Sequence, residues 1–183
     1  MKDFEYFDKH IATVPNFPKE GIQFKDITTT LEDAEAFQEA INTMISYLEK
    51  YDFDKIICAD ARGFLFGAPI AYALKKGLVI ARKPNKLPRP GYKFSYHLEY
   101  GENVMFISEG SIKPGEKIAV VDDLLATGGS SNAMVQLARE AGGTVNVAVF
   151  YIGLPMLKGK EYMLEHNPDK MYVYTVIDFA DVE

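Results

Sequence analysis

The chain has 183 residues, of which 48% are hydrophobic and 25% are charged, and its formal net charge is −6 at pH 7. This length predicts one domain with a full hydrophobic core, and the composition excludes general disorder. The acidic balance argues against a nucleic-acid-binding protein, because such proteins are usually basic.

The single cysteine, Cys58, excludes an internal disulfide and suits a reducing compartment. It lies in an apolar run at 55–59, so we expect a core residue rather than a nucleophile. No signal peptide opens the chain, and no apolar run approaches the ~20 residues that a membrane span needs. We therefore expect a cytoplasmic protein with no membrane partner.

In chain order, the first 30 residues are rich in aromatic residues, and the segment 17–24 is expected to be a loop because proline and glycine punctuate it. The first helix is predicted from about Asp33 to Lys50. Asp33 can cap this helix, and apolar residues recur within it at three- and four-residue spacing.

A strand is expected at 55–59, followed by a helix over 64–76. Pro69 lies inside this helix and is tolerated in a first turn, so the helix is predicted to start near that proline. Gly77 is a plausible C-cap. A second strand is predicted at 78–81.

A long loop is expected at 83–96, because three prolines and Gly91 fall within that stretch. In a compact domain such a loop is usually a lid, a binding loop or disordered. The later elements are a hairpin that ends near Ser108, a short strand at 117–121, a helix at 131–141, and strands at 144–152 and 172–177. This order predicts an α/β fold with a central, mostly parallel sheet flanked by helices, as one domain over residues 1–183.

One local basic stretch interrupts the acidic chain. Residues 81–93 contain no acid and include five basic residues: Arg82, Lys83, Lys86, Arg89 and Lys93. Such a stretch can hold an anionic small molecule, or it can be a solvated loop. Taken alone, these residues leave both interpretations open.

The most informative segment covers residues 118–131, where a buried strand is followed by Asp122 and Asp123 and then by a loop of small residues that opens a helix. Ligands in open α/β sheets bind beyond the carboxyl ends of the strands. The adjacent carboxylates can accept hydrogen bonds from two ribose hydroxyls. The helix N-terminus and the loop can bind a phosphate. The loop residues are Ala126, Thr127, Gly128, Gly129 and Ser130.

Two common nucleotide motifs are absent from this segment. No lysine follows the glycines, so the loop is not a P-loop, and the G-x-G-x-x-G fingerprint of dinucleotide-binding folds is missing. The combination of a carboxylate pair and a glycine loop therefore predicts a ribose-phosphate site of another kind.

The run Val120–Gly129 resembles the phosphoribosyl pyrophosphate loop of type I phosphoribosyltransferases, in the form that adenine phosphoribosyltransferases use. Three further stretches agree in order and spacing: 17–28, 60–67, and 82–88 followed by 98–101. The resemblance covers about residues 15–160. It implies the type I phosphoribosyltransferase fold, with a small hood at about residues 1–30 and a mobile lid loop at about residues 88–108.

The resemblance also implies an activity, namely transfer of the 5-phosphoribosyl group from phosphoribosyl pyrophosphate to adenine, giving AMP and pyrophosphate. Glu99 would be the catalytic residue and would take the proton from purine N7, and Tyr100, on the lid, would pack over the closed site. Mg²⁺ is expected to bind through substrate phosphates rather than in a protein cage. The implied partner is a second copy of the chain in a homodimer.

Site residues follow from the same resemblance. Asp122, Asp123 and the loop 126–130 would hold the ribose and the 5′-phosphate. Pyrophosphate contacts are implied for Ala61, Arg62, Arg82, Lys83 and Lys86. Base contacts are implied for Gln23, Phe24, Arg62 and Leu154.

Two positions depart from the family pattern. Ala61 stands where the family sometimes has serine, and Gly153 stands where many relatives carry glutamate, which bears on base selection. Two alternatives stay open. A 6-oxopurine phosphoribosyltransferase usually lacks the signature at 98–101. A non-catalytic regulator normally adds a DNA-binding domain, and the first ~50 residues show no basic helix-turn-helix pattern.

Overall fold

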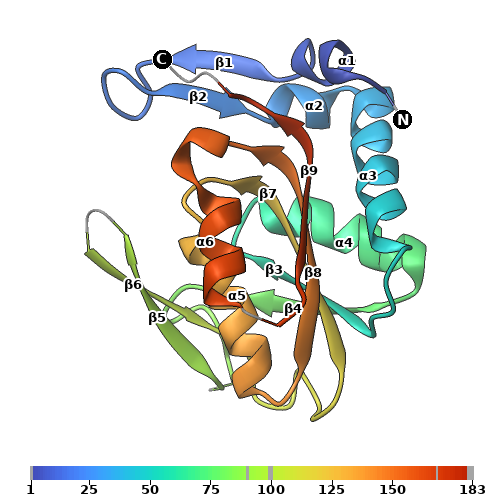
Figure 1. Cartoon of the computed structure of the whole chain (residues 1–183), viewed down its shortest axis with the longest axis vertical. Helices are drawn as coiled ribbons and strands as arrows, with labels where there is room; N and C mark the ends of the chain where they lie inside the picture. Colours follow the sequence, from blue (N-terminus) through green and yellow to red (C-terminus); the bar gives the residue numbers. More distant parts are fainter. Residues whose placement is uncertain (1, 90, 99–100, 168, 181–183) are drawn as a thin grey trace.

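A five-stranded parallel sheet forms the centre of the structure, a computed structural model that describes residues 2–89, 91–98, 101–167 and 169–180 (Figure 1). The strand order is β4-β3-β7-β8-β9, and each neighbouring pair is parallel. The strands are β3 (Lys55–Ala59), β4 (Gly77–Ala81), β7 (Lys117–Leu125), β8 (Thr144–Gly153) and β9 (Tyr172–Asp178). The predicted central parallel sheet is confirmed.

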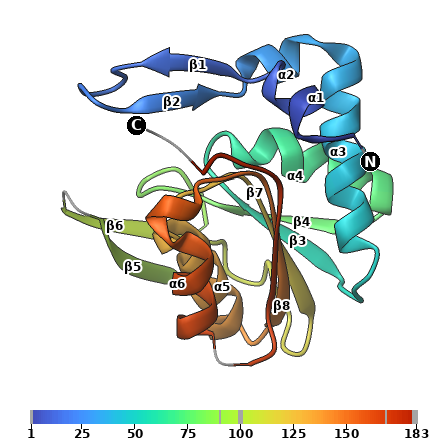
Figure 2. The same cartoon turned by 45° about the horizontal axis from the view of Figure 1, so that its top comes forward.

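Helices cover both faces of this sheet. Successive residues of its central strands point to opposite faces, and both sets are apolar, so both faces must be buried. Ile118 and Val120 of β7 belong to one core cluster, while Ala119 and Val121 belong to the other. Helices α3 (Ala34–Leu48) and α4 (Gly63–Leu74) pack on one face, and α5 (Gly129–Glu140) and α6 (Gly159–His166) pack on the opposite face (Figures 1 and 2). The short 3₁₀ turn η1 (Pro155–Leu157) precedes α6.

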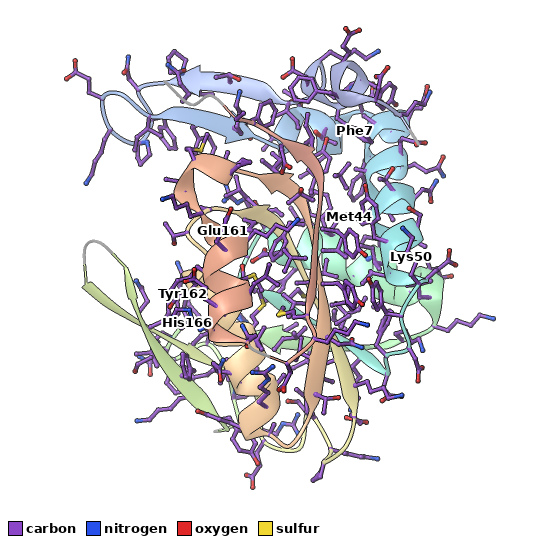
Figure 3. The ribbon with its side chains drawn as sticks, viewed as in Figure 1. Phe7, Met44, Lys50, Glu161, Tyr162 and His166 are labelled. Carbon is purple, nitrogen blue, oxygen red and sulfur yellow. The ribbon has the colours of Figure 1, made fainter. Side chains whose placement is uncertain are left out.

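The predicted start of α3 is confirmed at its cap. The carboxylate of Asp33 accepts a hydrogen bond from the backbone N–H of Ala36 at 2.9 Å. Met44 lies on the inner face of this helix and is fully buried (Figure 3). No helix in the described part of the chain is long and apolar enough to cross a membrane.

The limits predicted for the helix α4 were wrong at both ends. The helix begins at Gly63 and runs through Pro69, because buried residues such as Phe66 and Ile70 hold it on the sheet on both sides of the proline. It ends at Leu74, with Lys75 in the left-handed conformation. Gly77 instead opens β4, where a Cβ would lie 2.8 Å from Cγ of Lys55 on the paired strand.

A small layer, which we call the hood (residues 2–32), lies over the carboxyl edge of the sheet (Figure 2). It contains α1 (Phe4–Asp8), β1 (Ala12–Pro15), β2 (Gln23–Asp26) and α2 (Thr28–Glu32). Strands β1 and β2 are antiparallel, with Val14 opposite Phe24. The loop expected at 17–24 therefore ends early, because β2 already begins at Gln23.

The predicted hairpin consists of β5 (Lys93–Leu98) and β6 (Gly101–Phe106), which form a separate antiparallel pair beside the main sheet (Figure 1). The long loop expected at 83–96 is shorter than predicted, because β5 already begins at Lys93. Antiparallel pairing with β6 supplies the backbone hydrogen bonds that a free loop would lack.

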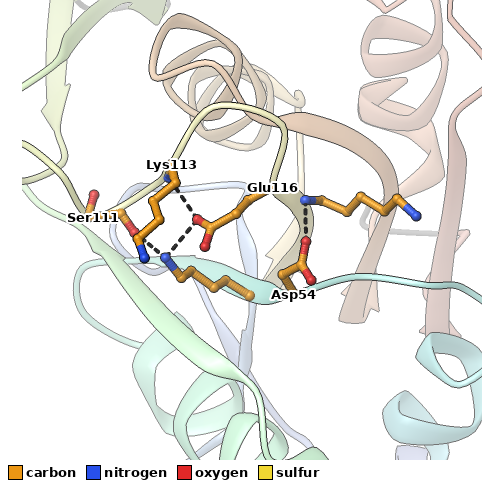
Figure 4. A network of polar contacts seen from close by, with 6 residues as sticks. Asp54, Ser111, Lys113 and Glu116 are labelled. Atoms are coloured by element: carbon orange, nitrogen blue, oxygen red, sulfur yellow. Dashed lines mark hydrogen bonds and ion pairs between the residues drawn. The ribbon is translucent and has the colours of Figure 1, made fainter.

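A polar network fixes the amino end of the sheet, opposite the hood (Figure 4). Lys55 Nζ donates to Glu116 Oε2 at 2.7 Å and to the Ser111 carbonyl at 2.9 Å. The same Glu116 oxygen accepts from the Lys113 backbone N–H at 2.8 Å. These bonds, led by that of Lys113, lower the pKa of Glu116. They tie the segment before β7 to β3, so the two strands stay in register.

Candidate active site

A cavity of about 320 Å³ lies at the carboxyl edge of the central sheet. Parallel strands end together at this edge, so the segments that follow β3 and β7 meet there. The lining comes from the turn after β3 (59–63), the end of β7 and the following loop (122–124 and 126–131), β4 with the residues after it (Ala81 and Lys83), and the hairpin. The structure thus brings together the glycine loop after β7 and the Asp60–Gly63 turn, both of which the sequence singled out.

The two aspartates form the floor of this cavity near the end of β7. Asp122 is 7% exposed and Asp123 is 6% exposed. Asp122 Oδ1 accepts a hydrogen bond from the backbone N–H of Asp123 at 2.9 Å. Burial, and next to it the neighbouring charge of Asp123, raise the pKa of Asp122 well above its ordinary value.

Arg62 balances part of this charge. Its Nε lies 2.8 Å from Asp123 Oδ2. That oxygen accepts no hydrogen bond within the described residues, so the contact is an ion pair without hydrogen-bond geometry. Asp123 Oδ2 is therefore a buried acceptor that a ligand hydroxyl in the cavity could satisfy.

Gly63 lets the start of α4 approach the carboxylate pair. A Cβ at this position would overlap Asp122 Oδ1. Farther along the helix, a Cβ at Gly67 would lie 2.7 Å from the Cys58 sulfur. Cys58 is fully buried, and burial, followed by the charge of Asp122, raises the pKa of its thiol to about 12. As predicted, this cysteine is a core residue.

The glycine loop between β7 and α5 is held from behind by the start of α6. Gly128 has φ of 84° and caps α5, a conformation that favours glycine. A Cβ at Gly128 would lie 2.7 Å from the Gly159 carbonyl, and a Cβ at Gly159 would overlap the Ala126 carbonyl. Two glycines that face each other thus let α6 pack on the loop while the loop faces the cavity.

The hood meets the turn after β3 through Phe24. The guanidinium carbon of Arg62 lies 5.5 Å from the centre of the Phe24 ring, which packs edge-to-face on Phe17. Phe24 and Gln23 are half-buried and do not line the main cavity. The residues predicted to contact the base therefore lie beside the cavity, on its hood side, next to Arg62.

Three of the predicted pyrophosphate residues line the cavity and two do not. Ala61 and Lys83 line the cavity together with Arg62. Arg82 braces the same region from behind, because its Nε donates to Asp60 Oδ2 at 3.1 Å and its Nη1 to the Lys86 carbonyl at 3.3 Å. The Lys86 side chain is exposed and is not part of the lining.

Leu154 lies apart from the main cavity. It lines a smaller cavity of about 120 Å³ together with Gly153 and Asp178. A Cβ at Gly153 would overlap Asp178 Oδ1, on the neighbouring strand β9. The carboxylate of Asp178 thus occupies the space that a side chain at position 153 would take, which accounts physically for the glycine.

Three hairpin residues that the sequence did not single out also line the cavity. They are Tyr96, Asn103 and Met105. Tyr96 and Asn103 are cross-strand partners, so they face the same side of the hairpin. Ser130 Oγ donates to the Tyr96 hydroxyl at 3.2 Å, which joins the hairpin to the glycine loop. Glu99 and Tyr100 lie outside the described residues.

Known proteins resemble this chain in both sequence and structure. The sequence profile of the phosphoribosyl transferase domain matches residues 28–182. An adenine phosphoribosyltransferase from Clostridium beijerinckii is 50% identical over 166 residues, which cover 91% of this chain and 96% of the relative.

Solved structures agree with the sequence relatives. The crystal structure of adenine phosphoribosyltransferase from Thermoanaerobacter pseudethanolicus has a TM-score of 0.90 and 41% identity, and the match covers 97% of this chain and all of that one. The enzyme from Saccharomyces cerevisiae, solved with adenine and an imino-altritol bisphosphate, has a TM-score of 0.85 and 32% identity, with 94% and 98% covered.

Proposed function

The chain belongs to the adenine phosphoribosyltransferase family of the type I phosphoribosyltransferases, and from that premise we propose that it transfers the 5-phosphoribosyl group of phosphoribosyl pyrophosphate to adenine. The products are AMP and pyrophosphate. The observation that carries this proposal is the buried Asp122–Asp123 pair, which shares one cavity with a glycine loop at the start of α5. The relatives named adenine phosphoribosyltransferase favour this reaction over the 6-oxopurine and regulator alternatives.

The carboxylate pair and the glycine loop suit the sugar phosphate. Asp123 Oδ2 is a buried acceptor that faces Arg62 Nε at 2.8 Å in an ion pair without hydrogen-bond geometry, so a ribose hydroxyl could still donate to it. Backbone N–H groups and hydroxyls of residues 126–130 would bind the 5′-phosphate, helped by the dipole of α5. Arg62, Lys83 and the turn at Ala61 lie at the same cavity and would bind pyrophosphate.

The reaction breaks the bond between ribose C1′ and a pyrophosphate oxygen, and it forms a bond between C1′ and adenine N9. As N9 attacks, N7 loses its proton, and Glu99 is the acceptor we propose. Pyrophosphate leaves with the electron pair of the broken bond. Tyr100 and the segment 88–108 would close over the cationic centre and exclude water that would otherwise hydrolyse it.

Mg²⁺ would enter with phosphoribosyl pyrophosphate. The residues at the cavity floor fit such an ion, because Asp122 and Asp123 are carboxylates and Mg²⁺ prefers oxygen ligands. These two carboxylates would face the hydrated ion while substrate phosphates bind it directly. When bound, the ion neutralises charge on the pyrophosphate oxygens.

The base would bind between the hood and the sheet. Phe24 and Leu154 would stack on the purine, with Gln23 and Arg62 beside it. Main-chain groups at residues 22–24 would accept a hydrogen bond from the 6-amino group of adenine and donate one to N1. A 6-oxopurine presents the opposite pattern and leaves these groups unpaired.

We also propose that the enzyme is a cytoplasmic homodimer. Helix α4 and the edge strand β4 carry four exposed apolar side chains, which together we call the α4–β4 patch: Leu65 (44% exposed), Tyr72 (88%), Leu78 (38%) and Ile80 (37%). Large apolar patches usually mark interaction sites. Part of the patch lies on α4, the helix that begins directly after Arg62. The occupant we assign to the patch is a second copy of the chain, as the resemblance implies.

The substrate assignment predicts strong discrimination between bases. With phosphoribosyl pyrophosphate and Mg²⁺ present, kcat/KM for adenine should exceed that for hypoxanthine or guanine by roughly 10⁴-fold, because sites that read hydrogen-bonding groups reject mismatched analogues to about that extent. Chromatography of the products measures this ratio. Use of hypoxanthine within tenfold of adenine would reassign the enzyme to the 6-oxopurine group.

Replacing the proposed proton acceptor should slow turnover without affecting substrate binding. Glu99→Gln is expected to lower kcat by roughly 10²–10⁴-fold, the usual contribution of general acid–base groups. The KM for phosphoribosyl pyrophosphate should change little. Glu109→Gln, an exposed acid just after the hairpin, serves as the control. Wild-type turnover in Glu99→Gln would remove this residue from the mechanism.

The dimer assignment predicts a sedimentation mass of twice the 20.5 kDa chain. Tyr72→Lys should shift the protein to the monomer, because it places a charge within the apolar surface that we assign to the dimer interface. Leu164→Lys, on the exposed side of α6, should leave the dimer intact. A wild-type monomer, or a Tyr72→Lys dimer, would contradict the assignment to this patch.

A further inference from the structure

Tyr151 lies where the central sheet, α4 and the hood meet, and the proposed mechanism does not use it. This residue of β8 is fully buried. Its ring stacks on Phe66 of α4 with centroids 5.3 Å apart, and packs edge-on against Phe7 of α1 at 6.0 Å (Phe7 is labelled in Figure 3). Its hydroxyl lies 3.1 Å from Thr30 Oγ1 in the hood.

The donors and acceptors at this junction fix the direction of that hydrogen bond. Thr30 Oγ1 donates its single proton to the His10 carbonyl at 2.8 Å. Tyr151 must therefore be the donor toward Thr30. The His10 carbonyl has a second lone pair and also accepts from Thr29 Oγ1 at 2.8 Å. Thr29 Oγ1 in turn accepts from the Ala12 backbone N–H at 3.1 Å.

This chain of hydrogen bonds runs from the central sheet to the strand that supports Phe24. Ala12 is the first residue of β1, and Val14, two residues on, is the register partner of Phe24 in β2. Phe24 in turn contacts the Arg62 guanidinium. The other end of the chain is anchored against Phe66, in the helix that begins directly after Arg62.

Among the described residues, other contacts that join the hood to the core are the edge-on packing of Phe4 against Phe179 at 5.8 Å, the Lys25 ammonium over the Phe179 ring, and the exposed ion pair of Lys2 with Glu35. Apolar burial holds two surfaces together but is non-directional, whereas a hydrogen bond fixes distance and angle. The buried chain through Tyr151 and Thr30 is therefore suited to set where β2 lies relative to Arg62.

We propose that Tyr151 and Thr30 are positioning residues that set the height of the hood over the base site, and so determine the affinity for the base but not for the sugar phosphate. This inference rests on the proposed function. The split follows from the architecture, because the groups assigned to phosphoribosyl pyrophosphate lie on the sheet side, on the turn after β3, on β7 and beside β4.

Steady-state kinetics with adenine and phosphoribosyl pyrophosphate test the inference. Thr30→Val keeps the shape but leaves the Tyr151 hydroxyl a buried donor without an acceptor. The KM for adenine should rise about five- to tenfold, because the hood that carries the proposed base contacts is no longer held at one height over Arg62. The KM for phosphoribosyl pyrophosphate and kcat should stay within about twofold. Thr30→Ser keeps the hydroxyl that contacts Tyr151 and the His10 carbonyl, so this variant should give wild-type values.

Two further variants separate positioning from stability. Tyr151→Phe removes the donor and leaves the bond from Thr30 to His10 intact, so a smaller rise in the adenine KM is expected, and this variant carries the test if Thr30→Val does not fold. Thr43→Val is the matched control, because Thr43 is a buried threonine on α3 whose hydroxyl has no hydrogen-bond partner within the described residues. It should leave both KM values unchanged.

Hydrogen exchange gives a readout that needs no substrate. The amides of β1 and β2 should exchange faster in Thr30→Val than in the wild type, while those of β7 should not change. An unchanged adenine KM, or an equal rise in both KM values, overturns the inference when the wild type makes AMP. If the wild type makes no AMP, the proposed function fails instead, and unchanged exchange in β1 and β2 then overturns this inference on its own.

Discussion

Two adjacent carboxylates buried at the end of one strand are the constraint on which the site depends. Like charges in a poorly solvated place repel each other and lose hydration, and the effective penalty is about several kcal/mol per ion. Three features offset this penalty. Arg62 forms an ion pair with Asp123, Asp122 accepts a hydrogen bond from the Asp123 backbone N–H, and the pKa of Asp122 is raised. One acceptor, Asp123 Oδ2, is still left without a hydrogen bond in the described structure. Such an arrangement suits a ligand that brings hydroxyl groups.

Around this pair, glycine residues let backbone segments approach their neighbours closely. Gly63 brings the start of α4 against Asp122, and Gly128 and Gly159 let α6 pack closely against the glycine loop between β7 and α5. Arg62 then connects the parts of the site, because it contacts Asp123 on one side and Phe24 of the hood on the other. Sugar, leaving group and base would thus meet around the Arg62 side chain, which lies between the turn after β3, the end of β7 and the hood.

Much of this was predictable from the sequence where a pattern was long or chemically specific. The apolar run at 55–59 gave the bounds of β3, Asp33 marked the cap of α3, and the segment 118–131 indicated the site. The hood elements were missed because each has five residues or fewer, too short for a periodic pattern. Pro69 misled the prediction because tertiary packing outweighs one lost backbone bond. Tyr96 depended on hairpin register, which spacing alone does not give.

The most direct test of the account is a calorimetric comparison of two probes, ribose 5-phosphate and inorganic phosphate, on the wild type and on Asp123→Asn. The amide keeps the shape but removes the charge and one acceptor. The affinity for ribose 5-phosphate should fall by about tenfold or more, while the affinity for inorganic phosphate should stay the same, because we assign the carboxylates to the sugar hydroxyls and not to the phosphate. Asp122→Asn should act in the same direction. An equal loss for both probes, or a change in the affinity for adenine alone, would contradict the assignment of this pair to the ribose.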